Sequence, residues 1–261
     1  MKLTNALSVL VDLSYAFRVA FLPTLRDILH APLLVFRPVQ LSRLFMAHVW
    51  VFIGNTTDEC YSSVKSGLLP DAHGVVLEIG AGRGHNIRYL DKTKVAKYVA
   101  LEPNTRMHSE IRKAAAEVGF TEDAGTFVLL PYGAEETGLI NSALGGPHTI
   151  DTIFSILTFC SVPNFENSIR PLVDQVLKPG GTLLFFEHVR SRRADVFWWQ
   201  RFWTPIWAKV FDGCELGRPV DTIIEGLDMW ERKEVTGIEG EDPETLFVHS
   251  IGRLTKVSTA A

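Results

Sequence analysis

The feature that most constrains this chain is a glycine-rich stretch, VLEIGAGRGHN, at residues 76–86. Gly80, Gly82 and Gly84 alternate with other residues directly after a run of apolar side chains. An apolar strand followed by such a loop and a helix is typical of nucleotide-binding α/β folds, because a ligand can approach bare backbone and free amide groups there. The spacing GxGxG differs from the dinucleotide fingerprint GxGxxG, and the phosphate loop that ends in Gly-Lys-Ser or Gly-Lys-Thr does not occur.

Strand patterns alternate with helical patterns from Gly74 onward. The predicted strands are Val75–Ile79, Lys97–Leu101, Thr126–Leu130, Thr152–Leu157 and Thr182–Glu187. The predicted helices are 84–92, Thr105–Gly119 and Phe165–Leu177, and the last is followed by a Lys-Pro-Gly-Gly turn at 178–181. This alternation predicts an α/β fold with a doubly wound, mostly parallel sheet.

The region before the sheet has a different composition, so we divide the chain into an N-terminal extension at 1–70 and a main domain at 71–261. The extension is apolar and predicts short helices interrupted by Pro23, Pro32 and Pro38. The helical stretch Leu7–Leu22 is apolar nearly all round, which predicts burial. Two interpretations remain open: a cap packed on the domain, or an interfacial membrane anchor. The uncharged run at 44–57 is too short for a convincing spanning helix.

Composition excludes several function classes. With 46% hydrophobic and 21% charged residues the chain is globular, and a net charge of −4 without a basic stripe argues against a nucleic-acid partner. Cys60, Cys160 and Cys214 contain no CxxC pair. We therefore expect reduced thiols in an intracellular, cytosol-facing protein, with no disulfide framework, no structural zinc site and no other metal.

Two carboxylates flank the glycine loop and indicate which nucleotide it holds. Glu78 lies two positions before Gly80 and would repel a pyrophosphate, but it suits a ligand with an ammonium group. Glu102 closes the second predicted strand, where a carboxylate can bind ribose hydroxyls. An ammonium group and an adenosine without phosphate describe S-adenosylmethionine.

These motifs resemble the class I S-adenosylmethionine-dependent methyltransferases over about residues 70–190. The matching segments are LEIGAGRG at 77–84, ALEPN at 100–104 and GAEE at 133–136. The resemblance implies a Rossmann-like sheet of seven strands, with Lys233–Ile238 and Leu246–Leu254 as the sixth and seventh. It also implies the cofactor-binding residues: Glu78, Gly80, Ala81, Gly82, Gly84, Asn86, Glu102, Pro103, Ala134, Glu135, Ser155, Ile156 and Leu157.

Three further segments resemble a narrower group, the membrane-associated methyltransferase-like thiol methyltransferases of the endoplasmic reticulum and lipid droplets. They are LTFCSVPN at 157–164, KPGGTLLFFEHV at 178–189 and WWQRFWTPIWAKVFDGC at 198–214. The resemblance implies S-methylation of a small hydrophobic thiol in the cytoplasm or on the cytosolic face of the endoplasmic reticulum membrane. It also implies peripheral contact with a membrane or lipid-droplet surface. The N-terminal region departs from that group because it is longer, proline-broken and more charged.

Two residues are candidate general bases. His188 follows the fifth predicted strand and has a suitable pKa, but a strand-end histidine bonded to backbone is an equally valid interpretation. Asp212 is the second candidate, although Asp-Gly is also an ordinary turn pair. Because direct transfer needs no covalent intermediate, we interpret Cys160 and Cys214 as small buried residues.

An aromatic-rich segment at 197–211 completes the pattern. Trp199, Trp203, Trp207 and Phe211 form one helical stripe that predicts packing on the domain, while the other aromatics would roof a substrate pocket or contact lipid. The function predicted is methyl transfer from S-adenosylmethionine to a thiol. The alternatives are an O-methyltransferase of phenolic secondary metabolites and a membrane or lipid-droplet scaffold that retains the cofactor fold.

Overall fold

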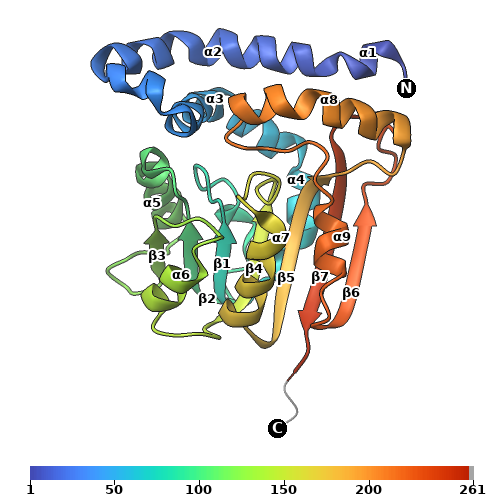
Figure 1. Ribbon diagram of the computed structural model, residues 1–261. Coiled ribbons are helices and arrows are strands. Elements are labelled where there is room, and N and C mark those ends of the chain that lie inside the picture. Colours follow the sequence, from blue (N-terminus) through green and yellow to red (C-terminus); the bar gives the residue numbers. More distant parts are fainter. Residues whose placement is uncertain (259–261) are drawn as a thin grey trace.

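Residues 1–258 are described by a computed structural model, and within them seven strands form one sheet in the order β3-β2-β1-β4-β5-β7-β6 (Figure 1). The strands are β1 (Gly74–Ile79), β2 (Val95–Leu101), β3 (Phe127–Leu130), β4 (Ile150–Ile156), β5 (Leu177–Val189), β6 (Trp230–Gly237) and β7 (Val248–Lys256). The first five are parallel, and β7 pairs antiparallel with both β5 and β6. The predicted doubly wound, mostly parallel sheet is confirmed.

Helices cover both faces of the sheet, as the burial of consecutive residues in its central strands requires. Leu77, Val99 and Ile153 contribute to one apolar layer, and their strand neighbours Val76 and Tyr98 contribute to the other. The helical elements after β1 are η3 (Ile87–Tyr89), η4 (Thr105–Met107), α5 (His108–Glu117), α6 (Thr137–Leu144), α7 (Phe165–Pro171), the π-helical η5 (Leu172–Val176), α8 (Ala194–Val210) and α9 (Val220–Glu225).

Parallel pairing brings the functional loops to one edge. Ile79 pairs with both Leu101 and Ser155, so the residues that follow β1, β2 and β4 meet where these strands end. The same edge lies beneath the N-terminal helices, which cross above the sheet together with α8 (Figure 1). The N-terminal elements are α1 (Leu3–Ala6), α2 (Ser8–His30), η1 (Pro32–Phe36), α3 (Pro38–Cys60), α4 (Ser62–Leu68) and η2 (Leu69–Asp71).

The N-terminal helix differs from its prediction in two ways. It is one long helix that continues through Pro23 to His30. Only one stripe of it is buried: Val9, Leu13, Ala16, Ala20 and Thr24. This stripe packs with Phe45 and Val49 of α3 and Trp203 of α8. The sequence predicted burial all round because the outward face is also apolar, although that face is open to solvent.

Two local predictions also differ from the structure. The helix expected at 84–92 is only the short η3, which ends where Leu90 takes an extended conformation. The turn expected at 178–181 lies inside β5, between the pairs Ile150–Leu177 and Thr152–Thr182. The four residues are therefore an irregular insertion in the ladder, with Gly180 at a φ of 74°.

Candidate active site

A cavity of about 890 Å³ lies between the carboxyl edge of the sheet and the N-terminal helices. Sequence-predicted residues line one side of it: Gly80, Ala81, Gly82, Asn86, Glu102, Pro103, Ala134, Glu135, Ile156, Leu157 and Asp212. The predicted site residues that do not line it are Glu78, Gly84, Ser155 and His188. A volume of this size is in the range of small-molecule and cofactor sites.

The glycine loop has the backbone freedom that the sequence indicated. Gly80, Gly82 and Gly84 have φ values of 64°, 57° and 81°, a region that other residues rarely adopt. A Cβ atom on Gly80 would lie 2.3 Å from Thr158 Cγ2, whereas one on Gly82 would meet nothing within 4 Å. The first glycine therefore allows close packing of two loops, and the second presents open backbone to the cavity.

Glu102 joins the glycine loop to the end of β2. Its Oε2 atom accepts a hydrogen bond from Gly82 N at 2.8 Å, and its Oε1 atom accepts one from Asn104 N at 2.8 Å. Burial raises the pKa of this carboxyl group to about 7, against the two amide donors, which lower it. Glu102 thus faces the cavity and fixes the loop that the ligand must approach.

Glu78 lies behind the cavity wall, which differs from the direct ligand contact expected from the sequence. It is fully buried, and its carboxylate accepts hydrogen bonds from Asn86 Nδ2 at 2.7 Å and from the Tyr98 hydroxyl. Because Asn86 donates its amino group to Glu78, its carbonyl oxygen is not used by that contact. That Oδ1 atom is buried and has no hydrogen-bond partner in the part of the chain that the structure describes. Glu78 therefore orients Asn86.

Ser155 and Gly84 also act from behind the cavity wall. Ser155 Oγ donates to Glu187 Oε1 at 2.6 Å, and the same oxygen accepts from Thr158 N at 2.9 Å. This buried carboxylate shapes the loop that follows β4, while Ile156 and Leu157 face the cavity. Gly84 lets the loop pack on α5, because a Cβ atom there would lie 2.8 Å from Ala114 Cβ.

A buried cation on the cavity wall was not predicted from the sequence. Lys65 of α4 donates to Asp58 Oδ1 at 2.7 Å, and Arg88 pairs with the other oxygen of the same carboxylate. Burial lowers the pKa of the Lys65 ammonium group to about 8. A lysine in a helix before the glycine loop belongs to no local motif, so only its tertiary position reveals it.

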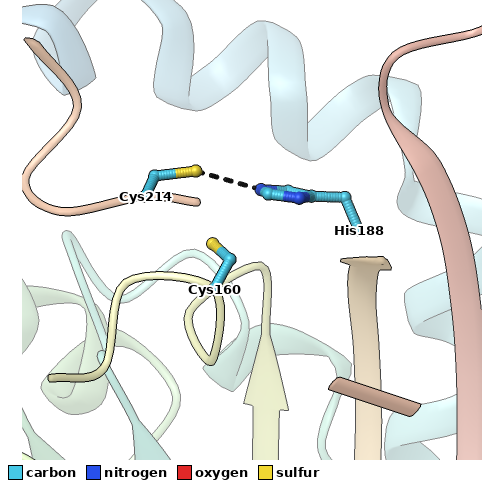
Figure 2. Close-up of side chains that lie close together, drawn as sticks. All are labelled: Cys160, His188 and Cys214. Atoms are coloured by element: carbon cyan, nitrogen blue, oxygen red, sulfur yellow. Dashed lines mark hydrogen bonds between the residues drawn. The ribbon is translucent and has the colours of Figure 1, made fainter. Parts of the chain in front are cut away.

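The two candidate bases occupy different positions. Asp212 lines the cavity, has a φ of 45° and lies 3.5 Å from Arg43 Nε. Burial raises the pKa of its carboxyl group. His188 does not reach the cavity, contrary to the expectation that its strand-end position would place it there. Its Nε2 atom lies 3.1 Å from Cys214 Sγ, so the ring is directed into the wall (Figure 2).

The opposite side of the cavity is mainly apolar and comes from the N-terminal helices. Its apolar side chains from α2 and α3 include Phe17, Phe21, Leu25, Ile28, Val39, Phe45, Met46 and Trp50. We call this apolar side, formed by α2 and α3, the roof of the cavity. The predicted aromatic stripe packs against it, because Trp203, Trp207 and Phe211 are buried and Trp199 is half-buried. Its packing role is confirmed, whereas Trp198 and Phe202 lie exposed on the outside of α8.

Comparisons with known proteins agree with this geometry. A family model described as "Methyltransferase domain" matches residues 59–219. The rat thiol S-methyltransferase TMT1B and human TMT1A are each 29% identical over 161 residues, and these alignments cover 61% of this chain and 62% of each relative. Human TMT1B is 31% identical over 163 residues, with the same coverage. The match thus spans less than two thirds of the length of these relatives.

Solved structures share the fold. An O-methyltransferase family protein from Burkholderia thailandensis has a TM-score of 0.57 at 13% identity, covering 85% of this chain and 61% of that one. A geranyl diphosphate methyltransferase in complex with SAM has a TM-score of 0.56 at 9% identity, covering 83% of this chain and 90% of that one. The chain belongs to the family defined by this methyltransferase domain, whose methyl donor is S-adenosylmethionine.

Proposed function

We propose that this protein transfers the methyl group of S-adenosylmethionine to a small hydrophobic thiol. The observation that carries the proposal is one cavity of about 890 Å³ with two unlike walls. One wall has the glycine loop and Glu102, and the other has the apolar side chains of α2 and α3. The thiol S-methyltransferases among its relatives support a sulfur acceptor.

In the proposed position, groups along the carboxyl edge of the sheet contact the ribose, the adenine and the amino-acid end of S-adenosylmethionine. Glu102 would accept hydrogen bonds from the ribose hydroxyls, and Ala134 and Glu135 would flank the adenine. Asn86 Oδ1 has no other partner among residues 1–258 and would accept a hydrogen bond from the ligand's ammonium group. Lys65 would pair with its carboxylate.

A comparison of two ligands tests the Lys65 assignment. S-Adenosylhomocysteine carries the amino-acid carboxylate, and 5′-methylthioadenosine lacks the amino-acid group. We expect Lys65→Met to weaken the first by about tenfold, as the loss of a charged hydrogen bond implies, and to leave the second nearly unchanged. An equal loss for both ligands would instead mean that Lys65 only holds Asp58.

The reaction itself needs alignment more than covalent help. A sulfur lone pair of the acceptor forms a bond to the methyl carbon while the bond from that carbon to the sulfonium breaks, leaving S-adenosylhomocysteine. The acceptor thiol loses its proton before or during attack. Asp212 is the candidate that faces the cavity and can accept this proton, with Arg43 beside it; for His188 we propose no direct role.

Acceptor panels test the function. Purified full-length protein is assayed with a hydrophobic thiol and with the phenol of the same carbon skeleton, and S-adenosylhomocysteine formation is measured. We expect turnover of the thiol, whose pKa near 8.5 makes the reactive anion more accessible than a phenolate near 10. Turnover of phenols alone would favour the O-methyltransferase alternative. Cofactor binding with no acceptor turned over would favour the scaffold alternative.

We further propose that the outward face of α2, η1 and α8 rests on a membrane surface. The helical segment Leu3–His30 is long and apolar enough to cross a membrane, with 28% of its most apolar part buried. Its exposed side chains include Leu22 at 62%, η1 adds Phe36 at 81%, and α2 lies on the side of the molecule away from the sheet (Figure 1). An exposed apolar patch of this kind fits a lipid interface.

Flotation with phosphatidylcholine and phosphatidylserine vesicles tests the surface. We expect the wild-type protein to float with the vesicles and the double variant Leu22→Glu, Phe36→Glu to float much less. Leu139→Glu is the matched control, because Leu139 is an exposed apolar residue of α6. Equal loss in the control, or no flotation of the wild-type protein, would argue against this surface.

A further inference from the structure

Three potential metal ligands meet behind the part of the cavity wall that Ser161 and Asp212 line. Cys160 lies in the loop after β4, His188 near the end of β5, and Cys214 in the segment after α8 (Figure 2). The two sulfur atoms and a ring nitrogen of His188 all lie within 4.8 Å of one another. Segments far apart in the sequence therefore present two thiols and one imidazole to the same small volume.

Burial leaves these groups with few other partners. Their exposed fractions are 1%, 6% and 6% in chain order. Outside the cluster, the hydrogen-bond partners of Cys160 Sγ within residues 1–258 are weak: the Leu157 carbonyl at 3.9 Å and Ser161 Oγ at 3.7 Å. His188 Nδ1 is buried without a hydrogen-bond partner in residues 1–258. A buried imidazole and two buried thiols that bond mainly to one another are unusual unless something links them.

The donor set matches one class of ion. Thiolate sulfur and imidazole nitrogen are the ligands that Zn²⁺ prefers, at about 2.3 Å and 2.0–2.1 Å from the metal. Tetrahedral coordination would place such donors about 3.5–3.8 Å apart. The three donors already lie within 4.8 Å of one another, and the pair of His188 Nε2 and Cys214 Sγ, now 3.1 Å apart, would open slightly. Two thiolates and one Zn²⁺ are together neutral, which matters in a site that is almost fully buried. We propose that Cys160, His188 and Cys214 bind one Zn²⁺ ion.

Binding replaces two protons. Each thiol loses its proton to solvent and binds as a thiolate, and His188 binds as the neutral imidazole. Trp207 Nε1 donates to Cys214 Sγ at 3.2 Å, a contact that supports a thiolate at this position. No fourth His, Cys, Asp or Glu among the described residues joins the cluster, so the fourth position would take water or another small ligand.

The zinc would connect the loop after β4 to the segment after α8, and both of these segments line the cavity. Ser161 follows Cys160, and Asp212 and Glu215 flank Cys214; all three line the cavity. His188 anchors both segments to β5. The ion would therefore hold Asp212 and its neighbours in place, and this role is independent of which acceptor the protein methylates.

Metal content of the full-length protein tests the proposal. The protein is produced in zinc-supplemented medium without chelators, and bound metals are measured by mass spectrometry. We expect about one zinc per chain. Cys160→Ser and Cys214→Ser should each lower the zinc content at least fivefold. Cys60→Ser is the matched control and should leave it unchanged, because Cys60 is exposed at the end of α3.

A second measurement avoids reliance on variants that fold poorly. Wild-type protein is stripped with a chelator and reloaded with Co²⁺, which should give the near-ultraviolet sulfur-to-cobalt absorption of thiolate ligation. The same absorption is expected in Cys60→Ser. Wild-type protein that holds no zinc and gives no such absorption would overturn the proposal. So would protein that holds only copper, or protein purified without reductant that contains a disulfide between Cys160 and Cys214.

Discussion

The two walls of the cavity are built from different kinds of interaction. The cofactor wall is set by backbone geometry and buried polar contacts: Gly82 presents open backbone, Glu102 bonds its amide, and Glu78 orients Asn86. The roof consists mainly of helical side chains held by apolar packing of α2, α3 and α8. The cofactor wall depends on a few residues whose chemistry other residue types do not reproduce. The roof depends on the total volume and the shape of its apolar side chains. Mutations should therefore separate cofactor binding from acceptor binding.

The largest effect is expected at the centre of the roof. Trp203 is 6% exposed, and its Nε1 atom donates to the Ala6 carbonyl at 2.7 Å, linking α8 to α1. Trp203→Ala should lower the free energy of unfolding by about 3–5 kcal/mol, because it leaves a large cavity. Denaturant unfolding measures this change.

The matched variant Trp203→Phe keeps most of the volume and loses the hydrogen bond, so its effect should be closer to about 1 kcal/mol. In conditions where Trp203→Ala is still folded, S-adenosylhomocysteine affinity should change less than twofold while the acceptor KM rises. An equal loss of both would show that the two walls are not independent.

The second largest effect is expected at Glu102. Glu102→Ala removes the acceptor of the Gly82 and Asn104 amides as well as the proposed ribose contact. We expect S-adenosylhomocysteine to bind about 10- to 150-fold more weakly, which corresponds to about 1.5–3 kcal/mol for hydrogen bonds to a charged group. Calorimetry at pH 8 measures the affinity.

Glu102→Gln provides the graded comparison, because it keeps one acceptor oxygen but loses the charge. Its affinity should lie between those of the wild-type protein and Glu102→Ala. Unchanged affinity in Glu102→Ala would remove this residue from the cofactor site.

The cofactor wall should also respond to pH, and the roof should not. Burial raises the pKa of Glu102 to about 7, and the ionised form is the better acceptor for ribose hydroxyls. Affinity for S-adenosylhomocysteine should fall as the pH drops from 7.5 to 5.5, approaching about tenfold per pH unit below the pKa. Glu102→Gln should remove this dependence.

The contribution of Glu102 to the free energy of unfolding of the ligand-free protein should instead increase as the pH falls. Because the folded-state pKa of Glu102 lies above the ordinary value of 4.5, its neutral form stabilises the fold. That contribution is complete below 4.5 and is lost as the pH rises through about 7. Thermal unfolding of wild-type protein and Glu102→Gln across this range measures the difference. A pH-independent difference, together with pH-independent affinity, would show that Glu102 titrates normally.

The same contrast explains what the sequence could predict. The glycine loop and Glu102 were found because each needs a particular residue type at a fixed distance from a strand end. The first five strands follow local apolar patterns, whereas the sixth and seventh were expected from the family resemblance. The contact made by Glu78 was not predictable, because the neighbouring strand supplies Tyr98 and the loop supplies Asn86.

Tertiary packing decided the remaining features. Lys65 reaches the cavity from a helix outside every motif, and no sequence pattern indicated that Cys160 lies near Cys214. The helix continues through Pro23: its buried stripe packs with α3 and α8 before the proline, and Asp27 bonds His48 of α3 after it. Such long-range contacts have no local signature in a single sequence.

The smallest effect is expected where the roof meets solvent. Phe21 lines the cavity but is 55% exposed, so truncation removes only part of an apolar contact with the acceptor. Phe21→Ala should raise the KM for a hydrophobic thiol by about fivefold, or about 1 kcal/mol, and leave cofactor affinity unchanged. Leu22→Ala is the control, because Leu22 is the next residue and does not line the cavity. If both variants raised the KM equally, the effect would come from the outer surface of α2 and not from contact between the cavity lining and the acceptor. If neither variant changed the KM, the acceptor contacts would lie deeper in the cavity, nearer Asp212.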